Sequence, residues 1–367
     1  MTDLLMPPPM LAAGPSTDPA EVLGLAESMF AIDVFTAALV RFGAVRALRD
    51  GPLTTPDWAR QAGMTERATR VVASLFEVLG VVEPVAPAAE QAAGPGAWQL
   101  TKLATEFLLP DAAWSIVPVY EALVRRPDCE AMAAVMAVPD AGAEPESDGE
   151  LDWAAGMGGL DFARFFLRST DSRNTYLAHA VAERLRPRGP RLLDVAGGSG
   201  LYSCALAKAY PGLRPVLLEQ PPVDLLAREA IEQRGLADRV SVRTGDMFSA
   251  DFGAEDGLRD FDTVLMSNVV HDWELPEVAA LLSAAWRALR PGGQLVLHDA
   301  FLGHGPSRDR PVAEYSGLLM KFTAGRCHSL ADIGTALRAA GFDSIEVAPS
   351  VVNRDLVVAV KLAGAER

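Results

Sequence analysis

The chain of 367 residues is half hydrophobic and carries a formal net charge of −15 at pH 7. This length predicts two domains, each able to bury a core of its own. The acidic balance argues against nucleic acid or an anionic membrane surface as a partner, because both attract basic surfaces, and the chain lacks a run of about 18 apolar residues that would predict a membrane span.

Residues 1–18 are expected to form a disordered tail. They include the consecutive prolines at positions 7–9 and lack the basic region that opens a secretory signal peptide. The three cysteines, Cys129, Cys204 and Cys327, are odd in number and far apart in the chain, which does not suit a disulfide framework. Together these features predict a cytoplasmic protein.

Residues 19–108 are predicted to form a mostly α-helical domain. Apolar residues recur at helical spacing over residues 21–30 and 35–48. Two short apolar segments, residues 81–85 and 97–100, are predicted to pair as the strands of a hairpin, with a loop rich in Ala, Pro and Gly between them.

Two further helices are expected ahead of that hairpin. Thr55 is expected to cap the first, with Pro56 at its first helical position, and Thr65 to cap the second. Two helices followed by a hairpin are typical of a winged helix, which serves either DNA binding or dimerisation. A DNA-reading helix needs several cations, but this one offers only Arg67 and Arg70. We therefore favour a dimerisation domain.

The remainder of the chain is predicted to form a connection and an α/β domain. Residues 109–184 are expected to be a helical connection, within which residues 137–152 are rich in Pro, Gly and acidic residues and predict a surface loop. Over residues 185–367 apolar strands alternate with helices. This pattern predicts a mostly parallel sheet with helices on both faces.

A glycine-rich turn is the most specific motif of the α/β domain. Residues 192–200 read Leu-Leu-Asp-Val-Ala-Gly-Gly-Ser-Gly, which ends a buried strand and opens a helix. Glycine lets the backbone approach a bound nucleoside, because no Cβ intervenes. The next apolar strand ends in Glu219, at the distance from Asp194 expected of an acid that binds ribose hydroxyls.

Later strands lead into Asp246-Met247 and Ser267-Asn268, and Leu-Arg-Pro-Gly-Gly at residues 289–293 precedes a fifth strand. This series resembles the class I methyltransferases that depend on S-adenosylmethionine (SAM). A dinucleotide-binding dehydrogenase would need a third glycine, which is missing here. Ala196 departs mildly from the glycine usual in the family. The resemblance implies SAM as cofactor, held by Asp194, Gly197, Gly198, Glu219, Asp246, Met247 and Ser267.

With a winged-helix-like domain in front, almost the whole chain resembles the small-molecule O-methyltransferases of plants and of actinomycete secondary metabolism, including antibiotic biosynthesis. The resemblance implies a homodimer formed through the N-terminal domain. It also implies that residues 109–184 line a cavity for a small-molecule substrate.

The catalytic motif follows the fourth strand of the α/β domain. His271, Asp272 and Trp273 stand there, and ligands of such sheets bind at the carboxyl ends of strands. This tripeptide is a hallmark of the family, whose histidine acts as general base on a substrate hydroxyl. Asp272 would orient the histidine, cap the next helix or ligate a metal. The resemblance implies that Asp299, after the fifth strand, orients the base.

One departure from the family pattern changes the expected chemistry. Plant enzymes read roughly Gly-Lys-Glu-Arg-Thr before their last long helix, whereas residues 325–329 here read Gly-Arg-Cys-His-Ser. Cys327 takes the place of the acid. His328 would then join His271 and Asp272 in a set of two imidazoles and one carboxylate, the composition of a facial triad for a divalent metal. Alternatively, His328 is a neutral cavity wall beside an ordinary base.

Three functions follow from these alternatives. The metal set resembles the α-keto acid C-methyltransferase branch of the family, so the preferred hypothesis is methyl transfer to the β-carbon of an α-keto acid chelated by zinc or iron at His271, Asp272 and His328. The enolising base is then open between His298 and Asp299. The alternative is a metal-free O-methyltransferase that acts on a phenolic or other hydroxyl group, with His271 as general base. The third is a winged-helix regulator that binds SAM without turnover.

A keto acid also needs a cation for its carboxylate. Arg164, Arg168 and Arg173 lie in the segment expected to line the cavity. Arg164 and Arg168 are the candidates that we assign to substrate binding, although each of the three suits a solvated surface position equally well.

Overall fold

The computed structural model describes residues 15, 17–85, 96–138, 156–249, 252–254 and 257–362. The chain divides into two compact units. The helical unit comprises Gly24–Gly149 and Leu302–Cys327, and the sheet unit comprises Met1–Leu23, Glu150–Phe301 and His328–Arg367. The expected tail, apart from residues 15, 17 and 18, and most of the expected acidic loop lie outside the described residues.

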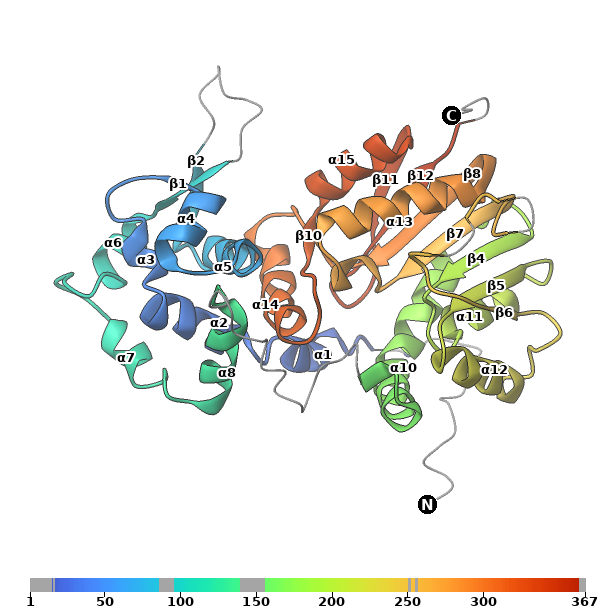
Figure 1. Cartoon of the computed structure of the whole chain (residues 1–367), viewed down its shortest axis with the longest axis horizontal. Helices are drawn as coiled ribbons and strands as arrows, with labels where there is room; N and C mark the ends of the chain where they lie inside the picture. The colour runs from blue at the N-terminus through green and yellow to red at the C-terminus, as the bar shows by residue number, and fades with distance from the viewer. Residues whose placement is uncertain are drawn as a thin grey trace. The chain divides into compact units, whose positions relative to one another are not determined.

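The sheet unit is built on a seven-stranded sheet in the order β11-β12-β8-β7-β4-β5-β6 (Figure 1). The strands β4 to β8 run parallel, and β12 pairs antiparallel with both β8 and β11. The predicted mostly parallel sheet is therefore confirmed. Its strands are β4 (Arg191–Val195), β5 (Arg214–Glu219), β6 (Ser241–Thr244), β7 (Phe261–Ser267), β8 (Leu289–Asp299), β11 (Ser344–Pro349) and β12 (Asp355–Val360).

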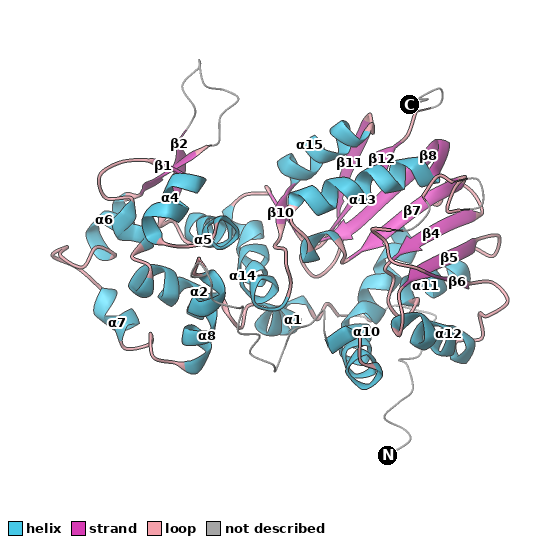
Figure 2. Ribbon diagram, in the orientation of Figure 1, coloured by secondary structure: helices cyan, strands magenta, loops and turns pink. Residues whose placement is uncertain are grey.

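Helices cover both faces of this sheet (Figure 2). Leu193, which points to one face, packs in the cluster formed with α13 (Leu275–Ala288) and α15 (Leu330–Ala340). Its neighbour Leu192 points to the other face and packs with α10 (Leu160–Arg184) and α11 (Leu201–Ala209). The period of two along the strands therefore sorts apolar residues into two cores. The helix α12 (Val223–Gln233) packs beside α11 over Leu217 of β5.

In the helical unit, the winged-helix pattern is present. The helices α4 (Thr55–Ala62) and α5 (Glu66–Val78) follow β1 and precede the hairpin of β2 and β3, and the three strands form an antiparallel sheet in the order β1-β3-β2. The side chain of Thr65 accepts a hydrogen bond from the amide of Ala68 at 3.1 Å, so the cap predicted for α5 is confirmed. The cap of α4 is Thr54 rather than Thr55, because Thr54 has the extended backbone that lets its hydroxyl accept from Asp57. The strands are β1 (Leu53–Thr54), β2 (Val82–Val85) and β3 (Ala97–Leu100).

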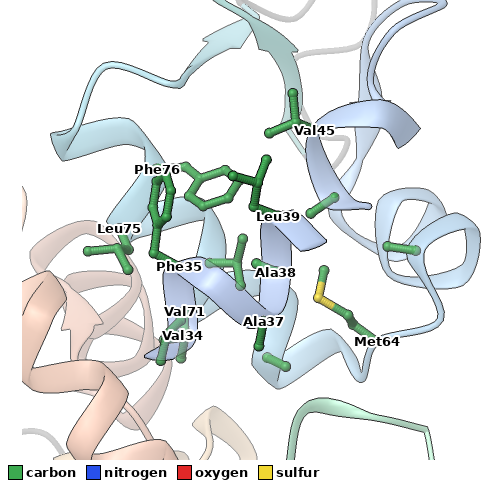
Figure 3. Close-up of a cluster of buried hydrophobic side chains, with 14 of the residues drawn as sticks. Val34, Phe35, Ala37, Ala38, Leu39, Val45, Met64, Val71, Leu75 and Phe76 are labelled. Atoms are coloured by element: carbon green, nitrogen blue, oxygen red, sulfur yellow. The ribbon is translucent and has the colours of Figure 1, made fainter. Parts of the chain in front are cut away.

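The helix expected over residues 35–48 is wrong as a single element. The chain forms α2 (Ala31–Thr36), a π-helical turn η2 (Ala37–Arg41) and α3 (Ala44–Ala47), and Gly43 breaks it with a φ of 58°. The core around these turns gathers apolar side chains of α2, η2 and α5 (Figure 3), among them Val34, Leu39, Val71 and Phe76.

The units divide the chain differently from the predicted domain boundaries. Residues 302–327, expected in the α/β domain, belong to the helical unit, and so does the first part of the expected connection. Met320 explains the first difference, since it lies buried in the helical core at the end of α14 (Pro306–Phe322). The remaining elements are α1 (Ala20–Glu27), α6 (Lys102–Phe107), α7 (Val117–Glu121), α8 (Pro127–Met136), η3 (Val270–Asp272), β9 (Phe301–Leu302) and β10 (His328–Ser329).

Within the described ranges, no single helix is long and apolar enough to cross a membrane, and one bent pair, Ala20–Glu27 with Ala31–Arg41, passes that test only when the two helices are taken together.

Candidate active site

The strand order of the sheet unit reverses between β4 and β7, which places a ligand crevice at the carboxyl ends of these strands. The chain leaves β4 through the glycine-rich turn, β5 at Glu219, β7 at Ser267 and β8 at Asp299. Most of the predicted site residues therefore lie at one edge of one sheet.

The backbone of the glycine-rich turn packs closely against side chains of β4 and β5. A Cβ at Gly197 would lie 2.5 Å from a methyl carbon of Leu217 and 2.6 Å from the carboxyl carbon of Asp194. Gly198 and Gly200 adopt left-handed φ values of 59° and 72°. Glycine reaches this region without steric strain, because it has no Cβ. Ala196 also has a positive φ, of 51°, so the family's glycine would suit that position better.

Two buried carboxyl groups flank this turn. Glu219 accepts from the amide of Gly198 at 3.0 Å and from that of Gln220 at 3.1 Å, and burial raises its pKa to about 7. Asp194 accepts from the hydroxyl of Ser203 at 2.7 Å, and burial raises its pKa to about 7 as well. Its second oxygen, Oδ1, is buried without a hydrogen-bond partner in the described part of the chain. Acceptor capacity is therefore available on both groups.

The other expected cofactor residues differ in surroundings. Asp246 caps the turn after β6 and accepts from the amide of Phe248 at 3.0 Å and the hydroxyl of Ser249 at 3.1 Å. Met247 packs against the apolar core below α13. The hydroxyl of Ser267 is buried and has no hydrogen-bond partner among the residues that the structure describes.

His271 lies in the short helix η3 after β7 and pairs with Asp299 at the end of β8. Its Nδ1 is hydrogen-bonded to Asp299 Oδ1, and its backbone amide lies 3.4 Å from the other carboxylate oxygen. The amide of Ala300 donates to Asp299 at 2.8 Å and fixes the carboxylate further. On the opposite side of the ring, Nε2 lies 3.5 Å from Asp272 Oδ1. The imidazole is thus held between two carboxyl groups.

The charges and burial of this group shift the pKa values of His271, Asp299 and Asp272 in different ways. Burial works to lower the pKa of His271, but the charges of Asp299 and Asp272 outweigh it, and the pKa rises. Burial would raise the pKa of Asp299, yet the charge and hydrogen bond of His271 hold it below its ordinary value. Burial raises the pKa of Asp272 to about 6. Asp299 therefore remains ionised and orients the ring, while Asp272 titrates near neutrality.

The predicted metal set is not assembled. The Nε2 of His328 lies 2.9 Å from the backbone carbonyl oxygen of Trp273, so this nitrogen carries a proton and donates it. His271 meanwhile points its two nitrogens at Asp299 and Asp272. No group of three or more His, Cys, Asp or Glu side chains within the described ranges is placed to hold a metal ion. The triad inferred from Cys327 and His328 is therefore not supported by this geometry.

The arginines of α10 are placed differently from one another. Arg164 forms an ion pair of 3.0 Å with Glu229 of α12, so its assignment to the substrate carboxylate lacks support. Arg168 is exposed. Burial raises the pKa of both Asp272 and Tyr202, and the charge of Arg173, which was not preferred, partly opposes that rise at each of them.

Sequence reasoning missed a buried polar network behind the base. Asn268, with a φ of 53°, donates to the hydroxyl of Tyr202 at 3.1 Å, and this hydroxyl lies 3.4 Å from Nδ1 of His298. Nε2 of His298 lies 3.0 Å from the hydroxyl of Ser350, and the buried Arg354 approaches Asn268 at 3.5 Å. Burial lowers the pKa of His298 to about 3, so it does not suit the enolising role considered for it. The one signal that the sequence offered was the residue type at position 268, since asparagine tolerates the positive φ found there.

The comparisons with known proteins identify the family of the chain. A family model described as an O-methyltransferase domain matches residues 153–343. The mitomycin biosynthesis 6-O-methyltransferase of Streptomyces lavendulae is 33% identical over 149 residues, 41% of this chain and 40% of the relative. The L-tyrosine C(3)-methyltransferase of the same organism is 33% identical over 156 residues, 42% of this chain and 41% of the relative. In both, the match spans about two fifths of the relative's length.

A solved structure matches over more of the chain. The O-methyltransferase family 2 protein from Planctomyces limnophilus, solved in complex with apigenin, is 26% identical with a TM-score of 0.80, and the match covers 97% of this chain and all of that one. The family model matches more than half of the residues of this chain, so the chain belongs to the O-methyltransferase domain family.

Proposed function

We propose that this protein is a SAM-dependent methyltransferase that methylates a hydroxyl group of a small secondary metabolite, with His271 as general base. The observation that carries the proposal is the buried pair of His271 and Asp299 at the carboxyl ends of β7 and β8. A histidine whose ring is oriented by a carboxylate is the ordinary device for taking a proton from a hydroxyl.

The residues of the turn fit the cofactor. The close contacts of Gly197 with Leu217 and Asp194 fix the path of the turn, and Glu219 and Asp194 offer acceptors for hydroxyl or ammonium groups. SAM supplies an electrophilic methyl group on a sulfonium. Because that methyl is already activated, the protein has to position the acceptor and remove its proton.

His271 is placed to remove the proton of the acceptor hydroxyl. In its neutral form, His271 donates from Nδ1 to Asp299 and keeps a lone pair on Nε2. Nε2 takes the hydroxyl proton, and the Asp299 carboxylate stabilises the resulting imidazolium. Asp272, beside Nε2, adds a second carboxyl group that favours the protonated ring.

Carbon methylation is the second candidate. The similarity to a tyrosine C(3)-methyltransferase favours it, because a deprotonated phenol carries negative charge on its ortho carbon as well as on oxygen. The same base would serve both outcomes. In the metal-dependent version, an α-keto acid is chelated by a metal at His271, Asp272 and His328. This version requires His328 to break its hydrogen bond with the carbonyl oxygen of Trp273.

The test is a turnover assay with methyl-labelled SAM, a panel of hydroxylated aromatics and phenylpyruvate, each with and without EDTA. We expect label on the oxygen of a phenolic acceptor, identified by mass spectrometry and NMR, at a rate that EDTA leaves unchanged. Methylation of phenylpyruvate alone, lost with EDTA, restored by zinc or iron and abolished by His328→Ala, would replace this proposal with the metal-dependent one.

We also propose a homodimer formed through the helical unit. This unit exposes large apolar side chains, namely Leu25, Met29, Ile32, Trp114 and Val119. Such side chains mark interaction surfaces when they are numerous. Light scattering at micromolar concentration should give about twice the chain mass of 39.0 kDa, and a mass equal to one chain would contradict the dimer.

A further inference from the structure

A buried ion pair lies against the glycine-rich turn, outside the base and its partners. Arg234, just after α12, approaches Asp171 of α10 with 3.1 Å between Nη2 and Oδ2. The two side chains are only 3% and 8% exposed. Both belong to the sheet unit.

Both partners hold Ser199, the residue between the two left-handed glycines. The hydroxyl of Ser199 donates to Asp171 Oδ1 at 2.9 Å. Arg234 donates from Nη1 to the backbone carbonyl oxygen of Ser199 at 2.7 Å and from Nη2 to its hydroxyl oxygen at 3.2 Å. The turn is therefore restrained at one residue by three hydrogen bonds, whereas Gly198 and Gly200 have no side chain to restrain it.

Stability alone does not account for this pair. Taking two charges out of water costs free energy, and well-packed apolar replacements of buried ion pairs are often neutral or stabilising. What the pair provides is a fixed position for the carbonyl and hydroxyl of Ser199. That position in turn aligns the amide of Gly198 with Glu219.

We propose that Asp171 and Arg234 are positioning residues that hold the turn of residues 197–200 in the conformation that binds SAM. The inference rests on the proposed function, since it assumes that the turn is the cofactor site. Neither side chain needs to touch the cofactor, and both act through Ser199.

The test measures the Kd of S-adenosylhomocysteine (SAH) by calorimetry for Asp171→Asn and Arg234→Met. We expect the Kd to rise about 10- to 100-fold, as when supporting groups of a binding site are removed, and the KM for SAM to rise with it, while kcat at saturating SAM stays within about threefold. The matched control is Glu229→Gln, which breaks the 3.0 Å pair with Arg164 between the same two helices without touching the turn. Its Kd should equal that of the wild type.

Two further variants separate positioning from folding. Ser199→Ala keeps the ion pair but removes the hydroxyl, and it should weaken SAH binding by a smaller factor. The double variant Asp171→Leu with Arg234→Met restores apolar packing, so its melting temperature should recover while its SAH affinity should not. Wild-type affinity in this double variant would reduce the pair to a structural role and overturn the inference, with the proposed function intact. A wild-type protein that binds neither SAH nor SAM would instead overturn the proposed function, and the inference with it.

Discussion

Replacing His271 with glutamine should lower kcat by about two to four orders of magnitude, the usual contribution of a general base, and should leave the Kd of SAH within about twofold. Glutamine keeps much of the volume and a hydrogen bond to Asp299 but cannot accept a proton. The measurement is steady-state turnover of the phenolic acceptor beside calorimetry of SAH binding. A loss of SAH affinity equal to the loss of rate would show that the variant disturbs the cofactor site rather than the chemistry.

The pH dependence of the wild type identifies the base. His271 acts in its neutral form, so kcat/KM should rise with pH, and the inflection should lie above the ordinary value of 6.5, because Asp299 and Asp272 raise the pKa. Asp299→Asn removes the stronger of the two carboxylates and should move the inflection to lower pH as well as slow the reaction. An inflection that stays in place would assign the proton transfer to another group.

Gly197→Ala should abolish measurable SAH binding and lower the free energy of unfolding by about 1–3 kcal/mol, the usual cost of overpacking a core. The new Cβ would meet Leu217 at 2.5 Å and the carboxyl group of Asp194 at 2.6 Å, closer than real contacts allow. Calorimetry and chemical denaturation measure the two effects.

Gly212→Ala is the matched control for this substitution. It has no heavy atom within 4 Å of the new Cβ, so both its affinity and its stability should stay near those of the wild type. Wild-type SAH affinity in Gly197→Ala would mean that the cofactor site does not depend on the conformation of the turn at this position.

The sequence predicts the local elements of the sheet unit well. The five strands that were predicted, β4 to β8, are all present, whereas β11 and β12, which complete the seven-stranded sheet, were not predicted. The local sequence of a helix does not determine the hydrophobic core in which the helix packs. The helix α14 follows β9 directly in the chain, yet Met320 and its neighbours pack in the helical unit. Nothing in its periodicity distinguishes that destination from packing on the sheet.

The candidate site shows the same contrast between what a local motif predicts and what only the pairing of strands determines. His271 and Asp299 were assigned because each stands beside a recognisable strand end. Arg354 was not, because an arginine ahead of a strand suggests a solvated charge. Only the antiparallel pairing of β12 with β8, in which Leu356 faces His298, brings it behind the base. His328 was proposed as a ligand from its residue type, whereas in the structure its Nε2 lies beside the backbone carbonyl oxygen of Trp273, a contact that the sequence does not indicate.

The network behind the base keeps one charge state while the base titrates. Burial holds the pKa of His298 near 3 and raises that of Tyr202 well above its ordinary value, so both stay neutral over the range in which a methyltransferase is assayed. The guanidinium of Arg354 stays charged throughout. The field that this network imposes on Asp299 is therefore constant with pH. Among the groups around the imidazole, only His271 and Asp272 are left to change charge near neutrality, while Glu219 and Asp194, with pKa values of about 7, titrate at the glycine-rich turn.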